Sequence, residues 1–124
     1  MKTIETKSAP AAIGPYSQAI LANGFLYTSG QIPLNPESGA IDGQTIEAQA
    51  EQAIKNLSEI LKAAGTDFSK VVKTTCFLAH ISDFAAFNAI YEKNFVSKPA
   101  RSCFEVAALP KGALVEIEAV AVVE

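Results

Sequence analysis

The chain of 124 residues has few of the residues from which metal sites and nucleophilic catalysts are usually built: one histidine, two cysteines and no tryptophan. A single histidine, His80, excludes a multi-histidine metal site, and a Ser-His-Asp triad would have to use that residue as its base. We interpret His80 as a loop residue without a chemical role. Cys76 and Cys103 have no CxxC spacing, which argues against a zinc knuckle or a disulfide framework. Neither the GxGxxG nor the Walker phosphate-binding loop occurs.

Charged residues are also scarce, at 19% of the chain, and 10 basic against 13 acidic residues leave a net charge of −3. The chain has no basic cluster, which disfavours nucleic-acid binding through a charged stripe. The longest apolar run, Ala119–Val123, is far shorter than the roughly 20 residues that span a bilayer. Lys7 and Ser8 stand where a signal peptide needs its apolar region. We therefore expect a single cytoplasmic domain, residues 1–124, with no membrane or nucleic-acid partner.

Hydrophobic residues, by contrast, make up 49% of the chain. A domain of this size has too few charged residues to cover so much apolar surface, so we expect one apolar face to be buried between copies. The composition thus predicts a homo-oligomer.

Turn and capping residues divide the first half of the chain. Asn23-Gly24 is a strong type I′ hairpin signal between strands at 18–22 and 25–29, and an irregular loop covers 33–45. From Ile46 the apolar residues recur at helical spacing to Ala64. Thr45 is placed to cap this helix, and Gly65 is placed to end it.

The second half alternates strands and a helix. Residues 71–78 are rich in β-branched side chains and predict a strand. Ser82 is expected to cap a second helix, which ends before Pro99. Two further strands, 101–106 and 115–123, are joined through a turn at 109–112. This order predicts an α+β sheet with both helices on one face.

The last strand alternates in polarity with a period of two. Ile117, Ala119 and Ala121 are expected under the helices, which leaves Glu116 and Glu118 on the uncovered face. If strands 101–106 and 115–123 pair antiparallel with consistent faces, Arg101 and Cys103 join the two glutamates on that face. We therefore expect the charged side chains of Arg101, Glu116 and Glu118 to lie together on a surface that is buried when copies of the chain assemble.

Arg101 is the only arginine in the chain, against nine lysines. A planar guanidinium grips a carboxylate through two parallel hydrogen bonds, which a lysine cannot do. Two interpretations follow. Arg101 forms an interface salt bridge with Glu116 or Glu118 that sets the oligomer geometry, or it holds the carboxylate of a small ligand while one glutamate handles protons. Cys103 is interpreted as a pocket-lining residue, since no histidine is predicted beside it to lower its pKa.

Two other segments place glycine and hydroxyl groups at strand ends. Gly30 either permits a ligand to approach the backbone closely or simply occupies a turn. Tyr16 either closes a pocket with its hydroxyl group or is a buried structural residue.

Motifs spread over almost the whole chain closely resemble the RidA family, also called the YjgF/YER057c/UK114 family. They are Ala12-Ile-Gly-Pro-Tyr-Ser-Gln-Ala19, Thr28-Ser-Gly-Gln-Ile-Pro33, residues 52–61, Phe87-Asn-Ala-Ile-Tyr91, Pro99-Ala-Arg-Ser102, Leu109-Pro-Lys-Gly112 and Val115-Glu-Ile-Glu-Ala119. The resemblance implies a chorismate-mutase-like, six-stranded mixed sheet with two helices on one face, assembled as a homotrimeric barrel with clefts between subunits.

The resemblance also implies an activity: hydrolysis of enamines and imines, such as 2-iminobutanoate and 2-iminopropanoate, to 2-keto acids and ammonia. These substrates are released by pyridoxal-phosphate-dependent dehydratases, and the family uses no metal or cofactor of its own. The alternatives are a trimer that binds small carboxylates for regulation or acts like a chaperone, and a ribonuclease or translation inhibitor. The net charge of −3 speaks against the ribonuclease.

The same resemblance assigns roles by motif position. Arg101 binds the substrate carboxylate, and Glu116 positions or activates the attacking water. The main chains of Cys103 and Gly30 contact the substrate. The remaining residues expected to line the cleft, from either subunit, are Tyr16, Ser29 and Asn88. The segment 94–99 is shorter than in many members, which affects the rim of the cleft and leaves the carboxylate anchor in place.

Overall fold

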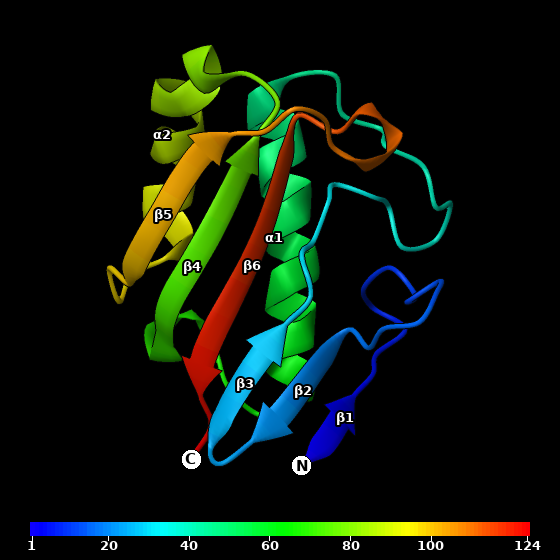
Figure 1. Cartoon of the computed structure of the whole chain (residues 1–124), viewed down its shortest axis with the longest axis vertical. Helices are drawn as coiled ribbons and strands as arrows, with labels where there is room; N and C mark the ends of the chain where they lie inside the picture. The colour runs from blue at the N-terminus through cyan, green and yellow to red at the C-terminus, as the bar shows by residue number, and fades with distance from the viewer.

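The computed structural model describes all residues, 1–124, as one six-stranded mixed sheet with helices behind it (Figure 1). The strands lie in the order β1-β2-β3-β6-β4-β5. All neighbours pair antiparallel except β4 and β5, which are parallel. The elements are β1 (Lys2–Ile4), β2 (Ala19–Ala22), β3 (Phe25–Thr28), α1 (Ile46–Ala63), β4 (Val71–Leu78), α2 (Phe84–Asn94), β5 (Ala100–Glu105) and β6 (Val115–Val122), with 3₁₀ turns at Phe68–Lys70, Ile81–Asp83 and Pro110–Gly112.

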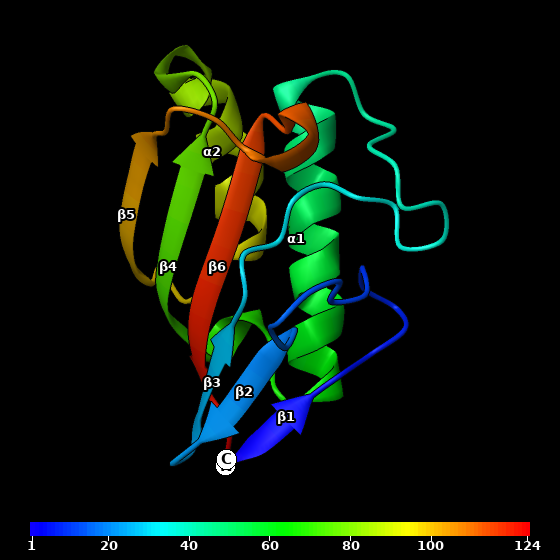
Figure 2. The ribbon, with the colours of Figure 1, turned by 45° about the vertical axis from the view of Figure 1, so that its right-hand side comes forward.

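Both helices cover the same face of the sheet, as Figure 2 shows from the side. The core lies between them and the sheet. It includes Leu57 and Ile60 of α1, Phe87 of α2, and Ile117 of β6, all fully buried. Ala119 and Ala121 are buried on the same side as Ile117, which confirms the expected α+β fold with two helices on one face. Neither helix has the combination of length and apolar character that a bilayer crossing requires.

Three local predictions are confirmed by the backbone. Asn23 and Gly24 have φ angles of 51° and 79°, as a type I′ turn demands. The hydroxyl of Thr45 accepts a hydrogen bond of 3.1 Å from the Ala48 amide and caps α1. Gly65 follows the last helical residues with φ 81°, a left-handed conformation that ends the helix.

Two local details differ from the prediction. Ser82 does not cap α2. It lies inside the 3₁₀ turn Ile81–Asp83, and Asp83 precedes the helix without a side-chain capping bond. The first strand, Lys2–Ile4, pairs with β2 and was not located in the sequence, because three residues carry too little periodicity to be recognised.

The pairing of β5 corrects a larger prediction. β6 lies between β3 and β4, whereas β5 is an edge strand that pairs in parallel with β4 alone. In this register Arg101 is opposite Thr74, which is itself opposite Ala119 on the helix-covered face. Since side chains alternate across a strand, Arg101 and Cys103 lie on the helix side of the sheet, and Glu116 and Glu118 lie on the other side.

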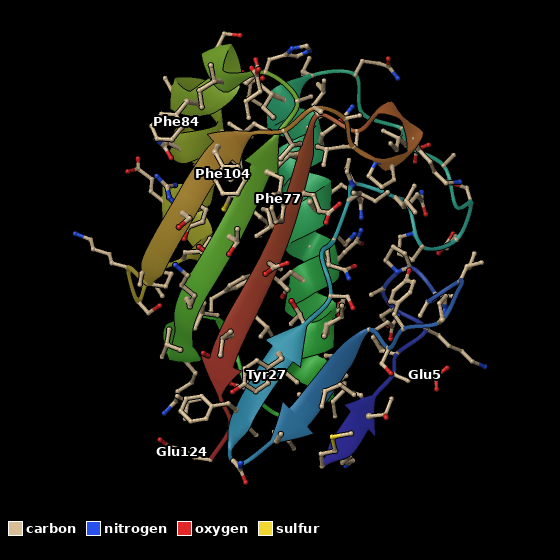
Figure 3. The ribbon with its side chains drawn as sticks, viewed as in Figure 1. Glu5, Tyr27, Phe77, Phe84, Phe104 and Glu124 are labelled. Carbon is tan, nitrogen blue, oxygen red and sulfur yellow. The ribbon has the colours of Figure 1, made fainter.

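The face without helices carries the apolar surplus of the composition. Large side chains stand out from it, including Tyr27 of β3, and Phe77 and Phe104 of β4 and β5 (Figure 3). The rings of Phe77 and Phe104 meet edge to face with centroids 5.5 Å apart. Tyr27 is 49% exposed and Phe104 44% exposed, so this face of a single chain presents aromatic rings to water. A surface of this kind marks an interaction site.

A buried amide on α1 holds the loop that follows β3. Asn56 is fully buried, and its Nδ2 donates to the carbonyl oxygens of Ile32 at 3.2 Å and Leu34 at 2.9 Å. The backbone of Gln31, one residue earlier, exchanges two hydrogen bonds with Ile117. The segment around Gly30 is therefore fixed between α1 and the start of β6.

We expect Asn56→Ala to destabilise the protein by about 1–3 kcal/mol, because two part-buried carbonyl groups lose their donor. Urea unfolding followed by circular dichroism measures this loss. Lys55→Ala, on the exposed side of the same helical turn, is the control and should stay within about 0.5 kcal/mol of wild type. Equal stability of the two variants would contradict the role of Asn56.

Candidate functional site

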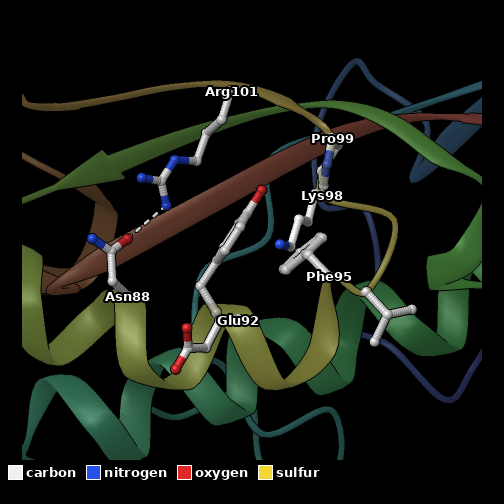
Figure 4. A pocket seen from close by; sticks show the side chains of 8 residues that line it. Asn88, Glu92, Phe95, Lys98, Pro99 and Arg101 are labelled. Atoms are coloured by element: carbon white, nitrogen blue, oxygen red, sulfur yellow. Dashed lines mark hydrogen bonds between the residues drawn. The ribbon is translucent and has the colours of Figure 1, made fainter.

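The guanidinium of Arg101 points from β5 toward α2 and is held there by neutral groups (Figure 4). Its Nη1 donates a hydrogen bond of 2.7 Å to Oδ1 of Asn88. The central carbon Cζ lies 4.7 Å from the ring centroid of Tyr91 and 5.4 Å from that of Phe84. We call Arg101, Asn88, Tyr91 and Phe84 the arginine cluster. Its rings stabilise the cation by cation–π attraction.

No carboxylate of the chain neutralises Arg101. The two ion pairs of the structure are Lys62 with Glu59 and Lys70 with Glu124, both distant in sequence from the cluster. Arg101 is only partly exposed, and one of its five N–H donors is used by Asn88. A half-buried guanidinium with free donors is suited to bind an anion.

A cavity of about 550 Å³ adjoins the arginine cluster. Arg101, Asn88 and Tyr91 line it, together with Lys98 and Pro99 from the turn before β5. The segment 94–99 thus rims the space beside the guanidinium, as expected from the sequence.

The Tyr91 ring is fixed by contacts on both its edge and its face. Its hydroxyl shares a 2.7 Å hydrogen bond with the hydroxyl of Thr74, a fully buried residue of β4. The ring also stacks on Phe95 with centroids 4.1 Å apart. Burial raises the pKa of the Tyr91 hydroxyl, so it stays a neutral hydrogen-bonding group. These contacts orient the ring on which the guanidinium lies.

A second group of candidate residues surrounds Glu116 at the start of β6. Glu116 lines a cavity of about 400 Å³ together with Tyr16, Gly30 and Lys111. A side chain at position 30 would overlap the Glu116 carboxylate where it now lies, so glycine lets that carboxylate approach the backbone. Burial, and to a smaller extent repulsion by Glu118, raise the pKa of the Glu116 carboxyl above its usual value. We call Glu116, Gly30 and Tyr16 the glutamate cluster.

The arginine and glutamate clusters lie on opposite faces of the sheet within one chain. The predicted neighbourhood of Arg101 with Glu116 and Glu118 is therefore wrong for a single subunit. The reason is the parallel pairing of β5 at the sheet edge, described above. An intrachain salt bridge between Arg101 and either glutamate is excluded by the same geometry.

The other candidate residues are distributed between the two clusters. Asn88 belongs to the arginine cluster, and the Cys103 side chain is on the same face of β5 two residues beyond Arg101. Tyr16 is 53% exposed rather than buried, which favours the pocket-closing interpretation. The Ser29 hydroxyl donates a 2.6 Å hydrogen bond to the Ser17 carbonyl, so it fixes the loop beside Gly30. No three His, Cys, Asp or Glu side chains are grouped so that they could hold a metal ion.

Sequence reasoning did not identify Tyr91 and Phe84 as neighbours of Arg101. Both are aromatic residues of the second helix, where burial in the core is the usual expectation, and Phe84 is in fact 37% exposed beside the guanidinium. The available signal was the position of Phe84, Asn88 and Tyr91 on adjacent helical turns, which places them on one side of α2.

The chain is similar to known proteins over almost its whole length. The family model described as Endoribonuclease L-PSP matches residues 6–123. The human 2-iminobutanoate/2-iminopropanoate deaminase is 54% identical, covering 98% of this chain and 89% of that protein. A Lactococcus lactis protein named as a regulator, AldR, is 59% identical over 100% of this chain and 99% of its own length.

Solved structures show the same fold. The YjgF gene product of E. coli has a TM-score of 0.93 and 48% identity, with 98% of each chain covered. E. coli TdcF, solved with bound serine, has a TM-score of 0.94 and 41% identity, with 100% of each chain covered. The mixed sheet and its two helices thus define a YjgF-type α+β domain. The chain belongs to the Endoribonuclease L-PSP family, which is the RidA family resembled by its motifs.

We expect Tyr91→Phe to destabilise the protein by about 1–2 kcal/mol, because the buried Thr74 hydroxyl loses its main partner. Adding Thr74→Val to this variant removes that hydroxyl and should recover part of the loss. Denaturant unfolding of the two single variants and the double variant measures the coupling. Tyr27→Phe, at an exposed ring, is the control; strictly additive effects at positions 74 and 91 would contradict the coupling.

Proposed function

We propose that this protein is a deaminase that hydrolyses 2-imino acids and their enamine tautomers, such as 2-iminobutanoate and 2-iminopropanoate, to 2-keto acids and ammonia. The observation that carries the proposal is the half-buried Arg101 guanidinium, which no carboxylate of the chain neutralises. The mammalian relatives named for this activity, among them the human protein at 54% identity, support the choice of substrate.

In the proposed mechanism Arg101 binds the substrate carboxylate, with Asn88 and Tyr91 fixing the guanidinium. The protonated imine carbon is already electrophilic, so the reaction needs chiefly orientation and a placed water. Water adds to the carbon of the C=N bond, a proton moves to nitrogen, and the C–N bond breaks to release ammonia and the 2-keto acid. Glu116 accepts and returns these protons, and because burial raises its pKa the carboxylate is a stronger base than an exposed glutamate.

Two clusters on opposite faces of one sheet cannot reach one small substrate, so the site requires a second copy of the chain. We infer a homotrimer in which the arginine cluster of one subunit faces the glutamate cluster of its neighbour. The exposed aromatic face supplies an apolar surface for this assembly. Gly30 and Cys103 then contribute main-chain contacts, and Tyr16, Ser29 and Asn88 line the cleft.

A binding or regulatory role is the second candidate, and two relatives favour it. The Lactococcus lactis protein is named as a regulator, and the E. coli TdcF structure holds serine, an amino acid with a carboxylate. The same guanidinium would serve such a role. Saturable binding of 2-ketobutanoate in calorimetry, without any acceleration of imine decay, would favour it over catalysis.

The deaminase is tested by generating 2-iminobutanoate with a threonine dehydratase and following its decay. We expect catalytic amounts of the protein to accelerate the decay. Arg101→Ala should lower the rate about 100-fold or more, because the substrate loses its anchor. Lys62→Ala removes a cation on α1 outside both clusters and should retain the wild-type rate. Full activity of folded Arg101→Ala would refute the anchor.

The shared site is tested by mixing two inactive variants, Arg101→Ala and Glu116→Gln, carrying different affinity tags. Trimers purified through both tags contain one cleft in which the intact arginine and the intact glutamate come from different subunits. We expect such mixed trimers to recover about a third of the wild-type rate. If the mixed trimers are as inactive as each parent, the site does not lie between subunits.

A further inference from the structure

The two cysteines of the chain lie directly opposite each other on neighbouring strands. Cys76 of β4 and Cys103 of β5 are register partners in the parallel pair, and both side chains lie on the helix-covered face. Adjacent strands are about 4.8 Å apart, which falls within the range of roughly 4.4–6.8 Å between Cα atoms that a disulfide spans. Both cysteines are free thiols in this structure.

The environments of the two thiols differ. Cys76 is fully buried, whereas Cys103 is partly exposed on the edge strand. A hydrogen bond from the Cys76 thiol, assisted by the charge of Arg101, lowers the pKa of Cys103 to about 7 against the opposing effect of burial. The same hydrogen bond and burial raise the pKa of Cys76. Cys103 is therefore the more acidic of the two thiols, without a neighbouring histidine, and Cys76 keeps its proton.

The difference between the two thiols matches the two roles in a two-cysteine redox site, where one sulfur reacts with the oxidant and the other forms the disulfide. The thiolate is the form that reacts with peroxides, and it must be reached from solvent. A second thiol in contact with the first can then convert the oxidised sulfur to a disulfide before it oxidises further. The partly exposed Cys103 meets the first requirement and the adjacent, protonated Cys76 meets the second.

We propose that Cys76 and Cys103 form a reversible intrachain redox pair, in which a peroxide oxidises Cys103 and Cys76 resolves it as a disulfide. The Cys103 thiolate attacks one peroxide oxygen, the O–O bond breaks, and Cys103 sulfenic acid and hydroxide form. The Cys76 sulfur then attacks the Cys103 sulfur, the S–O bond breaks, and water leaves with the Cys76 proton. The two thiols lose two electrons in total, and the peroxide is reduced to water.

The oxidation state of Cys103 also affects anion binding by the neighbouring Arg101. Without Cys76, continued oxidation would give a Cys103 sulfinate, an anion within the field of Arg101. Such an anion competes with a substrate carboxylate for the guanidinium, a consequence that rests on the function proposed above. Cys76 would thus keep oxidation at this site reversible.

The experiment exposes wild type and Cys76→Val to hydrogen peroxide at neutral pH, followed by thiol blocking, digestion and mass spectrometry. Valine places an apolar side chain with a preference for strands at this buried position. In wild type we expect a linked peptide joining Cys76 to Cys103 that dithiothreitol separates. In Cys76→Val we expect Cys103 sulfinic and sulfonic acids instead. Imine hydrolysis should recover under dithiothreitol in wild type and stay lost in the variant.

The wild-type peptide map decides the proposal even if the variant folds poorly. Sulfinic or sulfonic Cys103 beside a free Cys76 thiol in wild type would overturn it. A Cys103 disulfide between two chains, visible on a non-reducing gel, would overturn it as well. Because this readout does not use imine hydrolysis, a negative result here is distinct from failure of the deaminase assay.

Discussion

The central position of β6 determines how the rest of the molecule is arranged. This strand pairs with β3 on one side and β4 on the other, and its side chains alternate between a buried apolar face and a face with two glutamates. The α1 helix packs on the buried residues of β6. On the other face the backbone of Gly30 lies close to the Glu116 carboxylate, and burial raises the pKa of that carboxyl. Fold and chemistry therefore depend on the same alternation.

The edge position of β5 keeps the charge of Arg101 apart from the glutamates of β6. Because β5 is parallel to β4 and is connected to it through α2, its inward side chains meet helix residues rather than the glutamates of β6. Arg101 consequently obtains an amide and two aromatic rings as partners and keeps its positive charge available. The chain thus carries Arg101 and Glu116 on opposite faces of its sheet, and each has an open cavity beside it.

Features encoded by a few adjacent residues were predictable from the sequence. The hairpin at Asn23-Gly24 and the ends of α1 at Thr45 and Gly65 follow from local conformational preferences. The alternation within β6 was also correct. The sheet face on which Arg101 lies was predicted wrongly. It depends on which strand pairs with β5, and that pairing is determined by packing across the whole sheet. Arg101 and Glu116 were singled out from the residues themselves and Asn88 by the family resemblance, but neither source predicted the division into two clusters.

The outer edge of β5 is bounded by no other strand of the chain. Half of the peptide groups in the strand that carries Arg101 and Cys103 thus lack a backbone partner, which is a position of low local stability. Amide hydrogens there exchange with solvent more readily than those of β6, and a neighbour that covers this edge would slow them. A segment that paired with this edge would give those peptide groups partners and would stabilise the strand that carries Arg101.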